Sequence, residues 1–342
     1  MWFRKSIPPL MSLVISLLLG LLVITLTSSS PLEAAKAFFF GPFSNSYFFG
    51  NMLASAVPLI FTGLAAAVSF SSSAFNLGLE GQLYFGTLIG TYIAYKLGNF
   101  GLWTIVVILG AAFISGGSVA AVSGYLKSKW DVNELISSLL ISYSLIYIVN
   151  FFLAGPFTDP SAGLAASPYV SEKLMFSKLM LPSSLHSGLL LAIAISVVMY
   201  LIFSRHTWGY ELRITGRSQF FASYGGIDVR KTWITAMFLS GGLAALGGMI
   251  DVLGIHGRMI KGFSYGYGWN GIAVALIARN NPLLVIPSAL FFSYLESGAQ
   301  VGALMSDITP EVARVIQASV FYLVTAEGLA FFLKKRRRAE TA

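Results

Sequence analysis

Long apolar segments separated by short polar stretches dominate the sequence. Ten apolar segments stand out, at about 8–27, 51–70, 82–96, 101–125, 135–154, 187–204, 232–253, 263–278, 283–302 and 312–333. A helix needs about 20 residues to cross the hydrocarbon core of a membrane, and most of these segments approach that length. Backbone polar groups in lipid must be satisfied within the helix. The pattern therefore predicts an all-α polytopic membrane protein with about ten transmembrane helices, forming a single domain over residues 1–342.

Composition supports this interpretation. Of the 342 residues, 56% are hydrophobic and 11% are charged, whereas soluble domains carry about 25% charged residues. The chain contains no cysteine, which excludes disulfides and thiolate nucleophiles. It contains no G-x-x-x-x-G-K-[ST] phosphate-binding loop and none of the common hydrolase motifs. We therefore expect no enzyme activity and no cofactor in this chain, so that any ATP would be bound by another subunit.

The distribution of basic residues predicts the orientation. With alternating spans and a cytoplasmic N-terminus, 15 of the 22 basic residues lie on the cytoplasmic side, in agreement with the positive-inside rule. Both termini are then cytoplasmic, and the basic tail at 334–342 meets anionic lipid rather than nucleic acid. The first segment resembles a signal peptide, but nine more spans follow, which favours an uncleaved anchor.

One polar interruption lies at 71–82, where Asn76, Glu80 and Gln82 stand between apolar segments. A carboxylate at the membrane centre costs on the order of 2.5–3.5 kcal/mol. Either the chain forms a loop in the interface, with Asn76 bonding the local backbone, or these side chains face a polar cavity. Both interpretations are open on this segment alone.

A second interruption, at 263–270, precedes an apolar stretch too short to span the membrane. The span count places the two interruptions at opposite membrane faces, and each follows a span that contains GLAA. An inverted repeat with broken or re-entrant helices leaves this signature, and such helices line a solute path near the midplane. The predicted path residues are Asn76, Glu80, Gln82, Ser264, Tyr265, Tyr267 and Asn270.

The longest cytoplasmic loop, 205–231, contains the stretch GRSQFFASYGG, which has the form of a short helix between glycines. An amphipathic helix on the lipid surface and a peg in a groove of a cytoplasmic protein both fit its aromatic face. The candidate coupling residues are Arg213, Gly216, Arg217, Phe220, Phe221, Tyr224, Gly225 and Gly226.

The remaining candidates favour packing over chemistry. Small residues recur four apart at 116–124 and 240–248, as in closely packed membrane helices. Asp251, Glu296 and Glu327 are interpreted as packing or interfacial partners. As proton relays they would instead indicate an ion-coupled secondary carrier, which uses no ATP.

Five stretches resemble one known family: FNLGLEGQLYFGTLIG (75–90), VNELISSLLISY (132–143), TWGYELRITGRSQFFASYGGIDV (207–229), LSGGLAALGGMIDVLG (239–254) and GYGWNGIAVALIARNNP (266–282). They are similar, in order, to the membrane permease of bacterial ABC importers for branched-chain amino acids, ribose and nucleosides. NLGLEGQ followed by GYGWNGIAVAL is most similar to the nucleoside type.

The resemblance implies a type II-like ABC importer permease in the bacterial cytoplasmic membrane. It implies a second, related permease subunit, a cytoplasmic ATP-binding subunit and a substrate-binding lipoprotein. It places the segment around 216–226 against the ATPase and the two interruptions along the path of a purine or pyrimidine nucleoside. A sugar, a branched-chain amino acid or a signal molecule is the alternative solute. Phe220, Phe221 and Ser223 stand where the family often has alanines, so the fit to the ATPase could be individual.

Overall fold

A computed structural model describes residues 2–98, 101–312, 314–319 and 322–323. These residues are mainly helical, apart from the long stretch 155–187 and shorter loops, and within the described ranges extended pairing is confined to two isolated bridges. The helices are α1 (Trp2–Thr27), α2 (Pro31–Phe40), α3 (Ser46–Ser71), α4 (Leu79–Leu97), α5 (Leu102–Trp130), α6 (Glu134–Ala154), α7 (Gly188–Arg205), α8 (Thr207–Arg217), α9 (Gln219–Tyr224), α10 (Val229–Asp251), α11 (Tyr267–Ile277) and α12 (Pro282–Met305), with short turns η1 (Gly41–Phe43) and η2 (Glu172–Leu174) and a π-helical turn η3 (Val252–His256).

Six of the described helices are long and apolar enough to cross a membrane. They are α3, α5 from Trp103, α6, α7, α10 continued to His256, and α12. The predicted all-helical membrane architecture is confirmed at this level. The apolar stretch after the second interruption, predicted to be too short to span, corresponds to α11. Its 11 residues reach about half the hydrocarbon thickness at 1.5 Å per residue.

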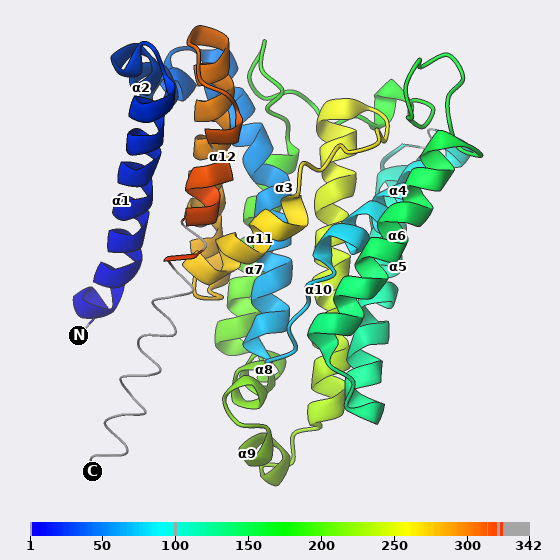
Figure 1. Cartoon of the computed structure of the whole chain (residues 1–342). Coiled ribbons are helices and arrows are strands. Elements are labelled where there is room, and N and C mark those ends of the chain that lie inside the picture. The colour runs from blue at the N-terminus through cyan, green and yellow to red at the C-terminus, as the bar shows by residue number, and fades with distance from the viewer. Residues whose placement is uncertain (1, 99–100, 313, 320–321, 324–342) are drawn as a thin grey trace. The chain divides into compact units, whose positions relative to one another are not determined.

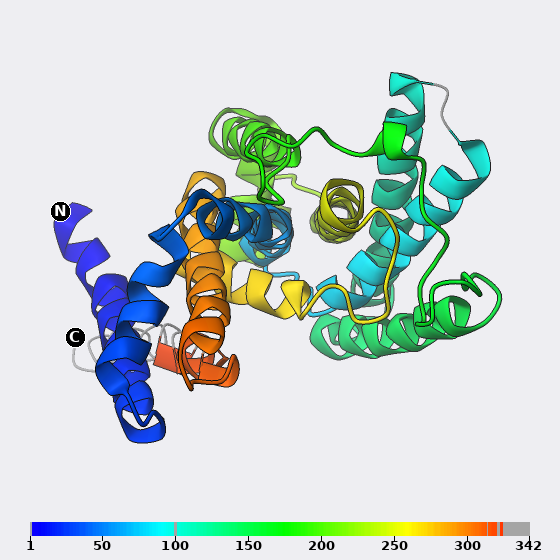
Figure 2. The ribbon, with the colours of Figure 1, turned by 90° about the horizontal axis from the view of Figure 1, so that it is seen from above.

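The chain divides into two compact units, residues 53–289 and a unit that joins 1–52 to 290–342. In the larger unit α10 packs closely against α5 and α4. Figure 1 shows α5, α6, α7 and α10 running alongside one another, with α8 and α9 at one end. In Figure 2 α10 is seen end-on while α11 is seen lengthwise, so α11 crosses the direction of the bundle.

Small residues explain the close packing of α5 on α10. A Cβ added to Gly241 would collide with the Gly116 carbonyl, and one added to Gly116 would meet the Gly241 carbonyl and Ala245. The two backbones are therefore in contact at this crossing, as expected for small residues spaced four apart. The predicted packing role of the stretches 116–124 and 240–248 is confirmed.

The smaller unit contains a helix that the pattern of apolar segments did not predict. α2 begins with Pro31 directly after Ser30 and carries Glu33 in its first turn, which are ordinary features of a helix start. Within this unit, Asp307 accepts hydrogen bonds from the backbone N–H of Ser29 at 2.6 Å and from its hydroxyl at 2.7 Å. A hydrogen bond from the Ser28 hydroxyl, followed by these two from Ser29, lowers the pKa of the Asp307 carboxyl well below its ordinary value.

Candidate functional site

The first polar interruption forms a break between α3 and α4 at residues 72–78. α3 ends in a turn in which Ser73 has a left-handed φ of 54° and the Ala74 N–H donates to the Ser69 carbonyl over 3.2 Å. This is the hydrogen-bond pattern of a C-terminal helix cap. The break predicted over 71–81 is thus confirmed in place, but it is shorter, because α4 starts before that stretch ends.

Two amide side chains connect this break to α4 and α10. Asn76 Nδ2 donates to Gln82 Oε1 over 2.8 Å, and Gln82 Nε2 donates back to Asn76 Oδ1 over 3.0 Å. Asn76 also donates to the Ser240 hydroxyl over 3.0 Å and accepts from the Gly78 N–H over 2.9 Å. Both amides are fully buried. The predicted local backbone bonding of Asn76 is therefore present, in its bond with Gly78, whereas a polar cavity at these amides stays a prediction.

Glu80 lies in the first turn of α4 and connects it to α11. Its carboxylate accepts a hydrogen bond from the Ser264 hydroxyl and one of 2.6 Å from the Gly268 backbone N–H. Gly268 belongs to the first turn of α11, where backbone N–H groups lack helical acceptors and attract negative charge. A Cβ on Gly268 would collide with the backbone of Glu80, so the glycine allows this close approach. The buried carboxylate is satisfied by a helix end.

The second interruption supplies one buried and three more accessible residues. Ser264 is fully buried, whereas Tyr265 is 77% exposed and has a left-handed φ of 46°. Tyr267 and Asn270 are half-buried and lie inside α11. Of the seven predicted path residues, the structure thus pairs Asn76 with Gln82 and Glu80 with Ser264.

Sequence reasoning missed the residues that hold the break against α5, α6 and α10. Lys127 pairs with Glu134 over 2.5 Å and donates to the Ser73 carbonyl over 3.0 Å. Glu134 also accepts the Phe75 N–H over 3.3 Å, and the Lys127 ammonium lies 4.7 Å from the Trp233 ring centroid. The sequence did contain a signal for this pair: a lysine and a glutamate flank the short turn between two spans. The orientation argument counted only the charge of the lysine and did not consider a partner for it.

The 205–231 loop contains two helices where one was predicted. α8 and α9 are separated at Ser218, whose backbone is extended at φ −160° and ψ 112°. The Ser218 side chain accepts the Phe221 N–H over 3.2 Å, which caps α9 and favours a new helix start over continuation of α8. The short helix predicted between Gly216 and Gly225 or Gly226 is present as α9, but it starts at Gln219, and Gly216 and Arg217 form the end of α8.

The predicted aromatic face and terminal glycines of the short helix are present. Phe220 is 91% and Tyr224 96% exposed, and Phe221 is also exposed. α9 ends where Gly226 adopts a φ of 82°, a conformation that suits glycine. This six-residue helix therefore presents three rings to its surroundings.

α8 contacts the break between α3 and α4 directly. The Ser73 hydroxyl donates to the Gly216 carbonyl over 2.9 Å. A Cβ on Gly216 would collide with the Ser71 carbonyl, so the two backbones touch. The segment predicted to contact an ATPase and the segment predicted to contact solute are therefore neighbours.

The histidines and the remaining carboxylates form no metal site among the described residues. His256 belongs to the π-helical turn, where its Nε2 lies 3.2 Å from the buried Asp251 carboxylate. His186 is buried in the 155–187 segment, and burial together with the nearby Lys178 charge lowers its pKa to about 4. Glu327 and the basic tail lie outside the described residues.

Comparison with known proteins gives a consistent result. Residues 48–325 match the family described as branched-chain amino acid transport system / permease component. A glucose ABC transporter permease of Haloferax volcanii is 28% identical, with 98% of this chain and 92% of the relative covered. A guanosine ABC transporter permease of Bacillus subtilis is 28% identical over 96% of both chains. A nucleoside ABC transporter permease of Lactococcus lactis is 28% identical over 98% of this chain and 95% of the relative.

The matched residues include both helix interruptions and all of α8 and α9. The membrane-length helices, the two interruptions and this match agree on a multi-pass transport component without a catalytic centre of its own. The chain belongs to the permease-component family of branched-chain amino acid transport systems.

Proposed function

We propose that the chain is the membrane-spanning permease subunit of an ATP-driven importer of purine or pyrimidine nucleosides. The observation that carries the solute class is the similarity, over nearly the whole chain, to permeases named for guanosine and for nucleosides. A sugar is the second candidate, because a glucose permease is equally similar. Branched-chain amino acids, signal molecules and ion-coupled transport have less support.

The proposed architecture is a single permease domain with about ten transmembrane helices in a bacterial inner membrane. Both termini would lie on the cytoplasmic side. The two interrupted helices would form an inverted pair whose ends meet inside the bundle. The contact of Glu80 with the start of α11 supports this arrangement, because discontinuous helices in transporters commonly direct their ends at one site.

The proposed solute path is lined by Asn76, Glu80, Gln82, Ser264, Tyr265, Tyr267 and Asn270. The mutual bonds of Asn76 and Gln82 leave both amides satisfied in this conformation. A nucleoside would replace these bonds with bonds to its ribose hydroxyls and base edges, while the tyrosines offer rings for stacking. Binding would thus exchange one set of hydrogen bonds for another, which limits its energetic cost.

Coupling would pass from α9 and α8 to the break. The exposed rings of α9 would seat in a cytoplasmic ATPase that binds all of the ATP, and the contact of Ser73 with Gly216 would transmit movement of α8. The permease would shift between states only if the ATPase binds them with different affinity. A second, related permease subunit and a substrate-binding lipoprotein would complete the importer.

Uptake by the assembled importer in proteoliposomes tests the solute class. We expect ATP-dependent uptake of radiolabelled guanosine or cytidine that an excess of unlabelled nucleoside abolishes and an excess of glucose leaves unchanged. Glucose uptake with no nucleoside competition would transfer the assignment to the sugar class. Uptake that stops with an ionophore but survives ATP depletion would contradict the ATP-driven mechanism itself.

A further inference from the structure

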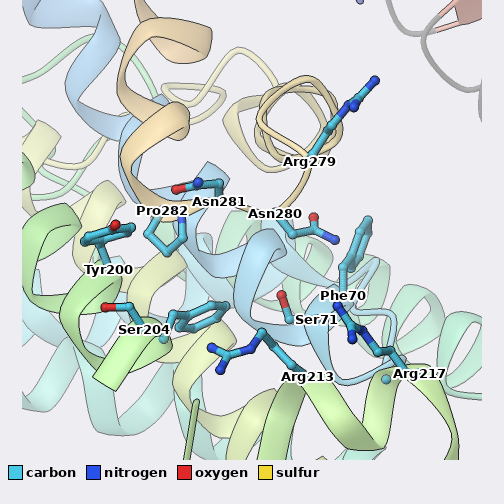
Figure 3. A pocket seen from close by; sticks show the side chains of 12 residues that line it. Phe70, Ser71, Tyr200, Ser204, Arg213, Arg217, Arg279, Asn280, Asn281 and Pro282 are labelled. Atoms are coloured by element: carbon cyan, nitrogen blue, oxygen red, sulfur yellow. The ribbon is translucent and has the colours of Figure 1, made fainter. Parts of the chain in front are cut away.

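A basic cavity of about 430 Å³ lies between α8, the end of α7 and the loop that joins α11 to α12. Its lining includes Arg213, Arg217 and Arg279, and no carboxylate is among the described residues that line it. Figure 3 shows Arg213 and Arg217 extending from α8 on the two sides of Ser71, whereas the Arg279 side chain is directed away from the other labelled residues. Two guanidinium groups therefore provide the positive charge of the cavity.

These two arginines lie four residues apart, on one face of α8. Neither forms an ion pair with a carboxylate in the part of the chain that the structure describes. Guanidinium groups bind phosphate oxygens through paired, charge-assisted hydrogen bonds. The cavity is thus complementary to an anion with several acceptor oxygens.

The opposite wall supplies a different kind of group. Asn280 follows α11 and has a left-handed φ of 57°, and its buried side-chain oxygen has no hydrogen-bond partner among the described residues. A buried acceptor without a donor is costly. An occupant that carries a hydroxyl group beside its anionic group would satisfy Asn280 and the arginines together.

The cavity is continuous with an apolar surface. Tyr200 on α7 lines the cavity and is also exposed, and its neighbours Val197, Val198 and Leu201 are exposed as well. α7 is one of the membrane-length helices, so these side chains meet lipid. An acyl chain could lie along them while its headgroup enters the cavity.

We propose that this cavity binds a phosphate-bearing group, namely the hydroxylated phosphodiester headgroup of an anionic phospholipid. Arg213 and Arg217 bind the phosphate, Asn280 accepts a headgroup hydroxyl, and the acyl chains lie against α7. Basic pockets between helices at the cytoplasmic side of membrane proteins bind headgroups in this way. The site is separate from the solute path, so its test does not depend on which solute is carried.

The test measures binding of phosphatidylglycerol and phosphatidylcholine to the purified full-length chain in neutral detergent by native mass spectrometry. We expect preferential retention of phosphatidylglycerol, and the double variant R213Q/R217Q should reduce it by roughly tenfold or more. The matched control R230Q/K231Q removes the same charge from exposed positions that do not line the cavity and should retain the lipid. Thermal unfolding of each variant checks that it is folded.

A second variant keeps both arginine charges and reduces the volume of the cavity. Ser204→Trp projects from α7 into the cavity and should lower phosphatidylglycerol retention without any change in charge. Binding of inorganic phosphate with the same dependence on the arginines, without lipid binding, would support the phosphate site and assign it to a soluble ligand. Equal retention in R213Q/R217Q and its control would overturn the proposal and leave the cavity for an acidic segment of a partner protein.

Discussion

At the scale of residues, the buried polar side chains of the two interruptions are hydrogen-bonded to one another or to a helix end. Asn76 and Gln82 satisfy each other, and Glu80 is satisfied by Ser264 and the start of α11. Unpaired, each of these groups would destabilise the fold by roughly 1–3 kcal/mol. The pairing explains how a sequence rich in apolar residues accommodates them, and it leaves groups that can exchange partners with a solute.

Gln82→Leu tests the role of the amide pair in transport. The leucine removes both hydrogen bonds to Asn76, so we expect nucleoside flux through the assembled importer to fall at least about tenfold while the complex still assembles. Size-exclusion chromatography and uptake assays on the same preparation separate the two effects. Gln300→Leu, at an exposed position of α12, is the control. Unchanged flux would remove Gln82 from the path.

His186 predicts a pH dependence of stability. Its pKa of about 4 in the folded chain lies below the ordinary 6.5, so between these values the unfolded chain binds a proton that the folded chain does not. Stability is therefore fully present above pH 6.5 and is lost as the pH falls toward 4, by roughly 1–3 kcal/mol. Thermal unfolding between pH 4.5 and 7.5 should show this loss, and His186→Asn should reduce it. The same slope in the variant would assign the effect to other groups.

At the scale of elements, α8 and α9 carry the contacts on which the proposed coupling rests. Its rings face outward, its last turn needs glycine at Gly226, and α8 touches the break at Ser71 and Ser73. In the proposed coupling, a movement of α9 would reach the polar break through the Gly216–Ser71 backbone contact and the Ser73–Gly216 hydrogen bond.

The double substitution Gly225→Val and Gly226→Val should uncouple the importer. Valine is strained at the positive φ of Gly226, so the end of α9 should reorganise while the spans remain intact. We expect ATP hydrolysis to continue and uptake to fall. Gly163→Val places the same strain in the 155–187 segment, where φ is 65° and no neighbouring atom is close, and should leave uptake unchanged. Normal uptake in the double variant would refute the coupling role.

The sequence predicted elements better than their contacts. Apolar length identified the six membrane-length helices of the described residues, whereas the total of about ten stays a prediction, and glycine and polar residues identified both breaks. The division at Ser218 was missed because a capping serine and an internal serine look alike in a sequence. The pairing of Lys127 with Glu134 was missed because hydropathy shows that a residue is polar but not which partner it meets.

At the scale of the molecule, the chain is a component of a multi-subunit transport system. It is a multi-pass helical protein without a phosphate-binding loop, and its family supplies transport components. Membership of this family implies an ATPase partner and a substrate-binding partner.

Reconstitution of the isolated chain tests this division of labour. Alone in proteoliposomes it should neither hydrolyse ATP nor accumulate nucleoside, because the groups that bind ATP are absent from its sequence. Addition of the ATPase, the second permease and the binding lipoprotein should restore both activities together. Accumulation by the isolated chain would favour a self-sufficient carrier.

The contact of Glu80 with the start of α11 has a consequence for the resting membrane. Separation of α4 from α11 would expose the Glu80 carboxylate and the start of α11 to water at the same time. Closure would have to remove that water again. On the proposed solute path this contact would close the route between transport cycles, and opening it would require a ligand or partner that offsets the cost of separating the carboxylate from the helix end.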